Sequence, residues 1–270
     1  MQKEKKYRVK KSLGQNFLKS VPALNKIVEA GELTSEDIVL EIGPGKGILT
    51  EKLLEKAGTV IAVEKDRELF EFLEDKFKHR IKSGSLVLVN DDILEFNIHK
   101  LTRQDLVGQR NYKIIANIPY NITGAILKKF LTEKNQPKLM VLMVQHEVGK
   151  RILAQDPRRG GAGAKESILS ISVKAYGEPK MIMKVPARYF SPAPKVDSAI
   201  ITIKNISRRI FGENNINEEK FWEIVKKGFA HKRKKLSGNL KGVVSDQILK
   251  PFLDKRAENL TLLDWISLSK

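Results

Sequence analysis

The sequence predicts an α/β fold with a doubly wound, mostly parallel sheet, followed by a small helical domain at the C-terminus. From Asp37 onward, short apolar runs alternate with amphipathic segments, which is the pattern of successive βα units. Near the C-terminus, Phe221, Val225 and Phe229 recur instead at helical spacing. A chain of 270 residues can bury the core of one ordinary domain and a smaller one.

The expected elements follow each other in a regular order. Strands are predicted at 38–42, 59–63, 86–89, 113–116 and 139–145, and helices at 47–56, 67–77 and 124–131. After the Pro192-Ala193-Pro194 interruption, 196–203 alternates apolar and polar residues and predicts a late antiparallel strand at the sheet edge. The polar stretch 205–220 is expected to be a linker, and one or two small helices should end the chain.

The composition is strongly basic. Lys and Arg number 50 against 32 Asp and Glu, giving a net charge of +18 and a sequence pI near 9.8. Residues 1–20 carry seven basic side chains against Glu4, so this tail should be mobile unless a partner orders it. Such a balance favours a polyanionic partner, either nucleic acid or an anionic membrane surface.

Other composition features exclude several classes of site. The chain has no cysteine, which excludes disulfides and thiolate metal sites, and its four histidines lack ligand-like spacing. We therefore expect no metal. No apolar run approaches membrane-spanning length and no signal-like segment follows the basic start, so a cytoplasmic protein, monomeric and without a membrane partner, is expected.

A glycine-rich turn follows the first predicted strand. Gly43, Gly45 and Gly47 occupy every second position, where a Cβ would hinder the approach of a ligand, and the next helix points its amide groups at negative charge. Glycines also serve simply as turn formers, so the turn alone is weak evidence. Glu64 ends the next strand and Asp92 follows the one after it, where carboxylates could accept hydrogen bonds from a ribose and an adenine amine. This pattern resembles the S-adenosylmethionine pocket of class I, Rossmann-like methyltransferases rather than the GxGxxG turn of NAD enzymes.

The tetrapeptide Asn117-Ile118-Pro119-Tyr120 follows the strand at 113–116 and resembles the signature of methyltransferases that modify exocyclic amino groups. The Asn117 side-chain oxygen and the Ile118 carbonyl could accept hydrogen bonds from an adenine N6, which would make that amine more nucleophilic. Pro119 restricts Ile118 to extended conformations, and Tyr120 could stack on the base. The alternative is a strand that ends at a proline and is followed by a turn.

Several ordered motifs together are similar to the rRNA adenine N6,N6-dimethyltransferase family. They are 14–18, 41–47 with Glu64 and Asp92, 117–123 and 190–198, with further similarity at 256–260. Within the family, 117–122 and 90–96 resemble the branch that methylates a large-subunit (23S) rRNA adenine in macrolide resistance. Gln145-His146-Glu147-Val148 with Arg151, 192–198 and 256–260 resemble the branch that dimethylates two adjacent adenosines of small-subunit (16S) rRNA during ribosome biogenesis, and we favour that branch.

The resemblance implies S-adenosyl-L-methionine as cofactor and rRNA, within a small ribosomal subunit particle, as partner. The implied cofactor residues are Gln15, Asn16, Leu18, Gly43, Gly45, Glu64, Lys65, Asp92, Ile93 and Asn117. The implied catalytic residues are Asn117, Ile118, Pro119, Tyr120 and Phe190, with Tyr120 and Phe190 on either side of the base. From sequence alone, Phe190 could equally be a core aromatic at a strand edge. A binding factor for ribosome assembly or transcription that has lost methylation remains the alternative of another class.

The expected domains are a basic tail at 1–20 that leads into the cofactor site, a methyltransferase domain at 21–204 and a helical RNA-binding domain at 205–270. In the last, Lys232, Arg233, Lys234 and Lys235 are expected on a helix face opposite Phe229 and Leu236. They are candidates for phosphate contact, although such a run is often only a solvated face. One departure from the family is Glu166-Ser167-Ile168 in place of a Tyr-Gly, preceded by the loop at 157–163. This leaves the loop's conformation and substrate contacts open, and Arg158-Arg159 could be a solvated turn.

Overall fold

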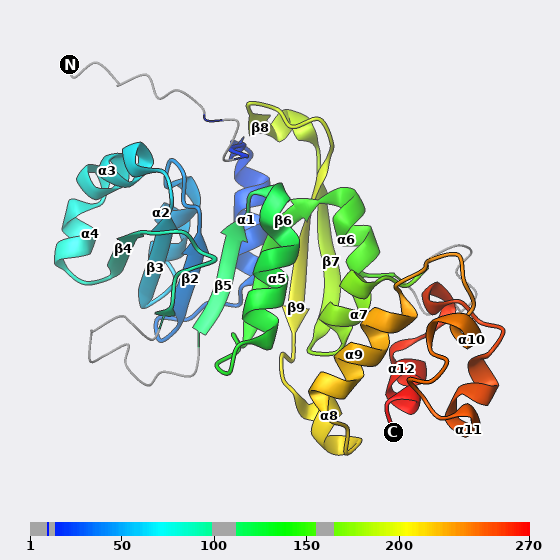
Figure 1. Ribbon diagram of the computed structural model, residues 1–270. Helices are drawn as coiled ribbons and strands as arrows, with labels where there is room; N and C mark the ends of the chain where they lie inside the picture. Colours follow the sequence, from blue (N-terminus) through cyan, green and yellow to red (C-terminus); the bar gives the residue numbers. More distant parts are fainter. Residues whose placement is uncertain (1–9, 11–13, 99–111, 155–164) are drawn as a thin grey trace.

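A seven-stranded sheet forms the centre of the molecule (Figure 1). The structure is a computed structural model and describes residues 10, 14–98, 112–154 and 165–270. The strand order is β4-β3-β2-β5-β6-β9-β7. The parallel strands are β2 (Ile38–Ile42), β3 (Thr59–Glu64), β4 (Leu86–Asn90), β5 (Tyr112–Asn117) and β6 (Leu139–Gln145). Strand β9 (Ser198–Lys204) runs antiparallel to both of its neighbours, β6 and β7 (Glu178–Val185).

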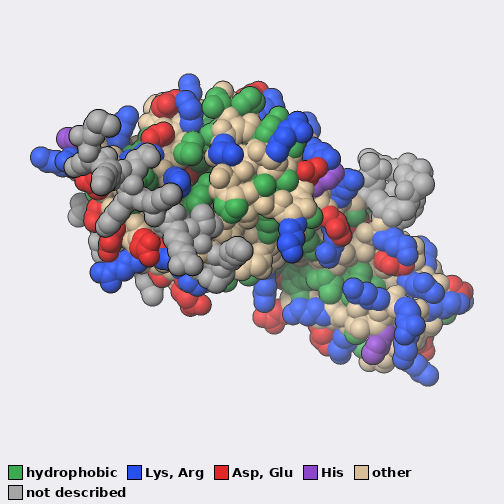
Figure 2. All heavy atoms as spheres, turned by 90° about the horizontal axis from the view of Figure 1, so that it is seen from above, with side chains coloured by type: hydrophobic (Ala, Val, Ile, Leu, Met, Phe, Trp, Pro, Cys, Tyr) green, Lys and Arg blue, Asp and Glu red, His purple; other side chains and the backbone are tan. Residues whose placement is uncertain are grey.

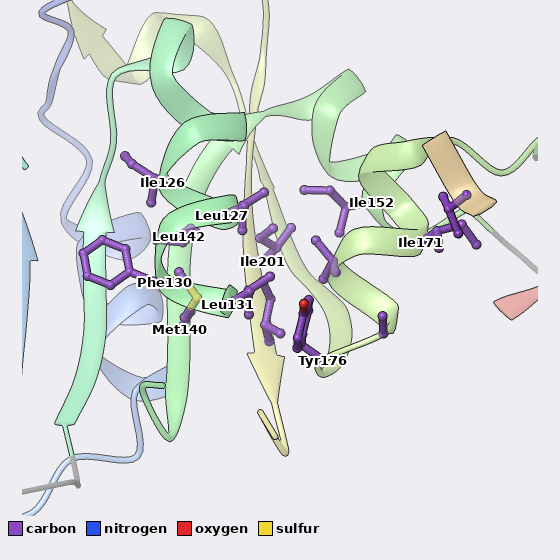
Figure 3. Close-up of a cluster of buried hydrophobic side chains, with 14 of the residues drawn as sticks. Ile126, Leu127, Phe130, Leu131, Met140, Leu142, Ile152, Ile171, Tyr176 and Ile201 are labelled. Carbon is purple, nitrogen blue, oxygen red and sulfur yellow. The ribbon is translucent and has the colours of Figure 1, made fainter. Parts of the chain in front are cut away.

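Helices cover both faces of the sheet because successive strand residues point to opposite faces. In β5, Ile115 packs in a cluster with α1 (Val21–Ala30), α2 (Ile48–Leu54) and α3 (Arg67–Lys76). Its neighbour Ile114 belongs to the opposite cluster, with α5 (Thr123–Thr132), α6 (His146–Ile152) and α7 (Ile168–Lys174). Figure 3 shows this second cluster between α5 and the strands β6 and β9. The short helix α4 (Lys78–Lys82) follows α3 beside β4.

The C-terminal helices pack against the second of these faces. They are α8 (Arg209–Glu213), α9 (Glu218–Gly228), α10 (Leu236–Asn239), α11 (Asp246–Leu249) and α12 (Leu262–Leu268). The Tyr176 ring, which follows α7, lies 5.6 Å from Phe211 and 6.0 Å from Trp222 between ring centroids. The Tyr176 hydroxyl also donates to Glu218 and accepts from the Trp222 indole N–H at 2.9 Å. These aromatic and polar contacts join the helical end to the sheet domain.

Two sequence predictions about this region are wrong. The late strand is not at the sheet edge, because β7, which the sequence analysis missed, pairs along its outer side. The stretch 205–220 is not a linker, because it forms α8 and the start of α9 and buries Phe211 and Ile216. The sequence analysis missed this packing because most residues of the stretch are polar. Arg208 hydrogen-bonds the Glu133 carbonyl at 2.9 Å and pairs with Glu218 at 3.0 Å, so polar groups in this stretch hold structure together.

The strands and helices predicted between 38 and 145 are confirmed, with ends shifted by one or two residues, and so is the predicted α/β fold with a C-terminal helical part. The division into domains at 20 and 204 stays a prediction. The predicted loop at 157–163 lies outside the described residues. Just after it, Ser167 caps α7 in a capping box with Ser170, and the buried Glu166 pairs with Lys174.

Replacing Phe211 tests whether 205–220 is packed structure. Phe211 is 5% exposed and its ring contacts Tyr176 and Phe221, so Phe211→Ala should lower the free energy of unfolding by about 3–5 kcal/mol. Urea denaturation monitored by circular dichroism measures the loss. The exposed Glu219→Ala is the control and should change the free energy by no more than about 0.5 kcal/mol. Equal stability of the two variants would mean that 205–220 behaves as a linker after all.

Candidate functional site

A cavity lies where the order of strands reverses. Strand β2 is flanked by β3 on one side and by β5 on the other, so the chain winds outward in both directions from the β2–β5 pair. In open α/β sheets, ligands bind outside the carboxyl ends of the strands at such a point. These ends lie at the top of Figure 1, and a cavity of about 250 Å³ opens there.

The glycine-rich turn forms one wall of this cavity. Gly43, Gly45 and Gly47 have φ values of +64°, +60° and +75°, a left-handed conformation that side chains disfavour. A Cβ on Gly45 would lie 2.9 Å from the Phe17 ring, and one on Gly47 would lie 2.5 Å from Phe77. A Cβ on Gly43 would meet no described atom within 4 Å. Gly45 and Gly47 are therefore needed for packing, whereas Gly43 leaves room for a ligand.

Two carboxylates line the cavity from the ends of β3 and β4. Glu64 is buried and accepts from the Gly45 amide at 3.0 Å and from the Asp66 amide at 2.9 Å. Burial raises the pKa of Glu64, although these two amide bonds oppose the rise. Asp92 accepts from the Lys65 ammonium at 2.7 Å, and this bond lowers the pKa of the Asp92 carboxyl. Lys65 and Ile93 line the same wall.

The segment 14–18 crosses the cavity and contacts both halves of the sheet. Gln15 donates to Asp66 at 2.9 Å, and Lys10 makes an ion pair with the same carboxylate at 2.8 Å. On the other side, the Asn16 carbonyl accepts from the Asn117 side-chain amide at 3.1 Å. This short segment therefore connects the glycine-rich wall with the end of β5.

The Asn-Ile-Pro-Tyr tetrapeptide forms the wall at the end of β5. Because Asn117 Nδ2 donates to Asn16, Oδ1 is the acceptor atom of that amide. Tyr120 opens a short 3₁₀ turn (Tyr120–Ile122) before α5 and is half-buried, and its hydroxyl lies 2.5 Å from that of Ser198. All ten sequence-predicted cofactor residues line the cavity, together with Ile118, Pro119 and Tyr120.

Phe190 occupies a different position from the other predicted catalytic residues. It lies in β8 (Phe190–Ser191), which pairs antiparallel with β1 (Phe17–Leu18), so that Leu18 stands opposite Phe190. The motifs at 14–18 and 190–198, far apart in sequence, are thus in direct contact. Phe190 is 2% exposed and is absent from the described residues that line the cavity.

The basic run at 232–235 also differs from its prediction. Helix α9 ends at Gly228 and α10 begins at Leu236, so the four residues lie in the turn between them and not on a helix face. The sequence analysis was wrong here because Phe229 and Leu236 are both packed inward without a shared helix. All four side chains are exposed, and Lys235 pairs with Asp254 at 2.6 Å. Figure 2 shows Lys and Arg side chains interspersed with acidic ones over the face seen from above.

Several cavity residues were not predicted from the sequence, among them Phe17, Glu41 and Asn121. Phe17 lies in the motif 14–18 and Glu41 in the motif 41–47. Their position in the sequence beside predicted cofactor residues could have identified them as cavity residues. Glu41 is 1% exposed, and its Oε2 has no hydrogen-bond partner among the described residues. Burial raises the pKa of Glu41 from 4.5 to about 8, and the nearby Glu64 adds to the rise. A protonated carboxyl therefore lines the cavity at neutral pH.

Glu41 should make stability depend on pH in the absence of ligands. Its pKa is higher in the folded chain, so its contribution is fully present below about pH 4.5 and is lost as pH rises towards 8. Glu41→Gln should remove this loss and exceed the wild type near pH 8 by about 4 kcal/mol. Urea unfolding from pH 5 to 8 measures the difference, with the exposed Glu55→Gln as a control whose difference stays flat. Parallel curves for Glu41→Gln and the wild type would contradict a buried, protonated Glu41.

Two further searches concern metal and membrane. In the described ranges, no group of three or more His, Asp or Glu side chains is placed to hold a metal ion. No helix in that same part of the chain is both long and apolar enough to cross a membrane.

Comparisons with known proteins give consistent results. The ribosomal RNA small subunit methyltransferase A of Dehalococcoides mccartyi is 38% identical over 268 residues, covering 96% of this chain and 86% of that protein. The proteins of the same name from Rippkaea orientalis and Fusobacterium nucleatum are 38% and 36% identical, covering 96% and 98% of this chain and 96% and 97% of their own lengths.

Solved structures agree with the fold. A dimethyladenosine transferase from Plasmodium falciparum superposes with a TM-score of 0.74 at 27% identity, covering 93% of this chain and 95% of that one. The 23S rRNA methyltransferase ErmE superposes with a TM-score of 0.70 at 23% identity, covering 94% and 98%, and supports the fold alone. The model of the ribosomal RNA adenine dimethylase family matches residues 6–270. The chain therefore belongs to the ribosomal RNA adenine dimethylase family.

Proposed function

We propose that this chain transfers methyl groups from S-adenosylmethionine to N6 of adenosines in small-subunit (16S) rRNA, dimethylating two adjacent adenosines during ribosome biogenesis. One observation carries the proposal: a single cavity combines the glycine-rich turn and two strand-end carboxylates with Asn117 and Tyr120. The small subunit is named in the relatives that are 36–38% identical over nearly the whole chain. The proposed site of action is the cytoplasm, on a small-subunit particle, with the chain as a monomer.

The cavity offers polar groups and space that suit the cofactor. Gly43 leaves space beside the turn for the methionine part, and Glu64 and Asp92 stand at successive strand ends for the ribose and the adenine amine. Bound there, S-adenosylmethionine supplies an activated methyl group, so neither a metal nor a covalent nucleophile is needed.

Asn117 and Ile118 hold the attacking amine. Asn117 Oδ1 and the Ile118 carbonyl accept the N6 hydrogens, and the bond from Asn117 Nδ2 to the Asn16 carbonyl keeps Oδ1 facing the reacting centre. The bound cofactor would supply its methyl group to the N6 lone pair that these two acceptors hold, and the methylated nitrogen would release its proton to water. Placing the reacting atoms in line can contribute about 7–11 kcal/mol.

Tyr120 provides the main surface for the flipped base. Flipping a stacked adenine costs a few kcal/mol, and stacking on an aromatic ring returns roughly 1–3 kcal/mol. The Tyr120 ring lines the cavity at the turn after β5, so it can meet a base that enters beside Asn117. Phe190 is proposed as the opposite wall, and its burial means that its face must become accessible when the base enters.

The direct test offers labelled S-adenosylmethionine with unmethylated small-subunit and large-subunit particles, followed by mapping of the modified bases. We expect two adjacent dimethylated adenosines in the small-subunit rRNA. Methylation of the large subunit instead would assign the chain to the branch that methylates 23S rRNA in macrolide resistance. Cofactor binding without transfer to either particle would favour a non-catalytic assembly factor.

Asn117→Ala should slow transfer and spare cofactor binding. An N6 hydrogen bond that strengthens as charge develops is worth about 1.5–3 kcal/mol, which corresponds to roughly a ten- to hundredfold loss in single-turnover rate. Cofactor affinity by calorimetry should stay within a few-fold of the wild type.

Glu64→Ala tests the cofactor side of the cavity and should weaken cofactor binding. Full activity of Asn117→Ala, or unchanged affinity of Glu64→Ala, would remove the respective residue from its proposed role.

The run Lys232, Arg233, Lys234 and Lys235 is proposed to contact RNA phosphates. Each contact contributes about 0.7–0.9 to the slope of log affinity against log salt, so the quadruple change to Gln should flatten the slope by about 3. If Lys235 stays with Asp254, the expected change is about 2. The chosen adenine should not change, because phosphate contacts position the protein without specifying a base.

A matched control removes the same charge elsewhere. Lys56, Lys78, Arg80 and Lys82 are exposed near α2 and α4, in the half of the sheet away from the C-terminal helices (Figure 1). Changed together to Gln, they should leave the salt slope nearly as in the wild type. Equal slopes for both quadruple variants and the wild type would mean that 232–235 is a solvated turn.

A further inference from the structure

Ser198 is a buried hydroxyl residue in contact with the proposed base platform. Its side chain is fully buried, and its Oγ lies 2.5 Å from the Tyr120 hydroxyl, at the distance of a short hydrogen bond between two hydroxyls. Either hydroxyl can donate. Tyr120 and Ser198 are 78 positions apart in sequence, so this bond forms only in the folded chain.

The antiparallel direction of β9 explains how Ser198 reaches the site. Ser198 is the first residue of β9 and pairs with Gln145, the last residue of β6. Strand β6 runs parallel to β5, where Asn117 is opposite Met143. The beginning of an antiparallel strand therefore lies at the same edge as the carboxyl ends of its parallel neighbours. A parallel strand in this place would put its last residue there instead.

The backbone alone leaves the Tyr120 ring incompletely fixed. Tyr120 starts a single 3₁₀ turn, in which its carbonyl accepts from the Thr123 hydroxyl at 3.1 Å. That bond holds the main chain, whereas the ring direction depends on the two side-chain torsions. The hydroxyl at the far end of the ring lies on the χ2 axis, so a bond there restrains χ1 and thereby fixes where the ring lies in the cavity. Ser198 supplies the partner there.

We propose that Ser198 is a positioning residue that orients the Tyr120 ring for stacking on the target adenine. This inference rests on the proposed function, because it assigns Ser198 a role in the reaction at that site. It also explains why a serine begins β9 rather than an apolar residue like its neighbours Ala199 and Ile200. Among the described residues, the hydrogen bond of the buried Ser198 hydroxyl is the one to Tyr120, which satisfies it.

A purely structural role can be separated by using a second hydroxyl on the same strand. Thr202 lies four residues along β9, is 1% exposed, and its Oγ1 has no hydrogen-bond partner among the described residues. Thr202→Val keeps the shape and removes a hydroxyl that bonds nothing at the site. It is the matched control and should transfer methyl groups at the wild-type rate.

The test is a double-mutant cycle of Ser198→Ala and Tyr120→Phe, each of which removes the same bond from one side. We expect each variant to slow single-turnover methyl transfer to the small-subunit particle by about three- to tenfold. The double variant should be no slower than either single one. Cofactor affinity by calorimetry, RNA affinity by filter binding and the thermal midpoint of Tyr120→Phe should stay near wild type, because the ring itself remains.

The outcomes distinguish the inference from the proposed function. Wild-type rates for Ser198→Ala and Tyr120→Phe, with a large loss for Tyr120→Ala, would overturn the positioning role and leave the base platform in place. Additive losses in the double variant would also overturn it, because the two hydroxyls would then act separately. A wild-type rate for Tyr120→Ala would refute the base platform. If Ser198→Ala fails to fold, Tyr120→Phe against Tyr120→Ala still decides whether the hydroxyl matters.

Discussion

The reversal of strand order between β2 and β5 determines where this protein can bind a ligand. Because β3 and β4 lie on one side of β2 and β5 and β6 on the other, the loops after β2 and β5 lead to helices on opposite faces. They diverge and leave a space at the carboxyl edge. The glycine-rich turn and the Asn-Ile-Pro-Tyr segment are the two loops on either side of that space. In the proposed function, cofactor and substrate would meet there because of the topology, before any side chain is considered.

The segment 14–18 makes these two walls act as one site. It bonds to Asp66 beyond β3, to Asn117 at the end of β5 and, through β1, to Phe190 in β8. The Asn117 amide is oriented by a carbonyl of this segment, so the geometry of the catalytic side depends on a stretch that also packs Phe17 against Gly45. Changes in this segment should therefore affect the cofactor wall and the substrate wall together.

The sequence was sufficient where a signal is local. The strands, the glycine turn, Glu64, Asp92 and Asn117 were predicted because apolar runs mark the strands and ligands gather where parallel strands end. Features that depend on distant partners were not predictable in this way. Strand β7 shows only a weak alternation of buried and exposed residues, and Phe211 lies in a polar stretch. The run at 232–235 follows helix α9, which ends earlier than the spacing of apolar residues predicts. The contact between Ser198 and Tyr120 depends on the antiparallel pairing of β9 with β6.

The different burial of the two aromatic residues bears on how a base is held. Tyr120 is half-buried and lines the cavity, whereas Phe190 is 2% exposed and is held by its pairing with Leu18. One aromatic contact returns roughly 1–3 kcal/mol, which is comparable to the cost of flipping a base. The ring that is accessible before the base enters must therefore supply most of this energy, and it can do so only in the right orientation. In the proposed reaction that requirement falls on Tyr120, and its hydrogen bond to Ser198 is proposed as a determinant of the rate.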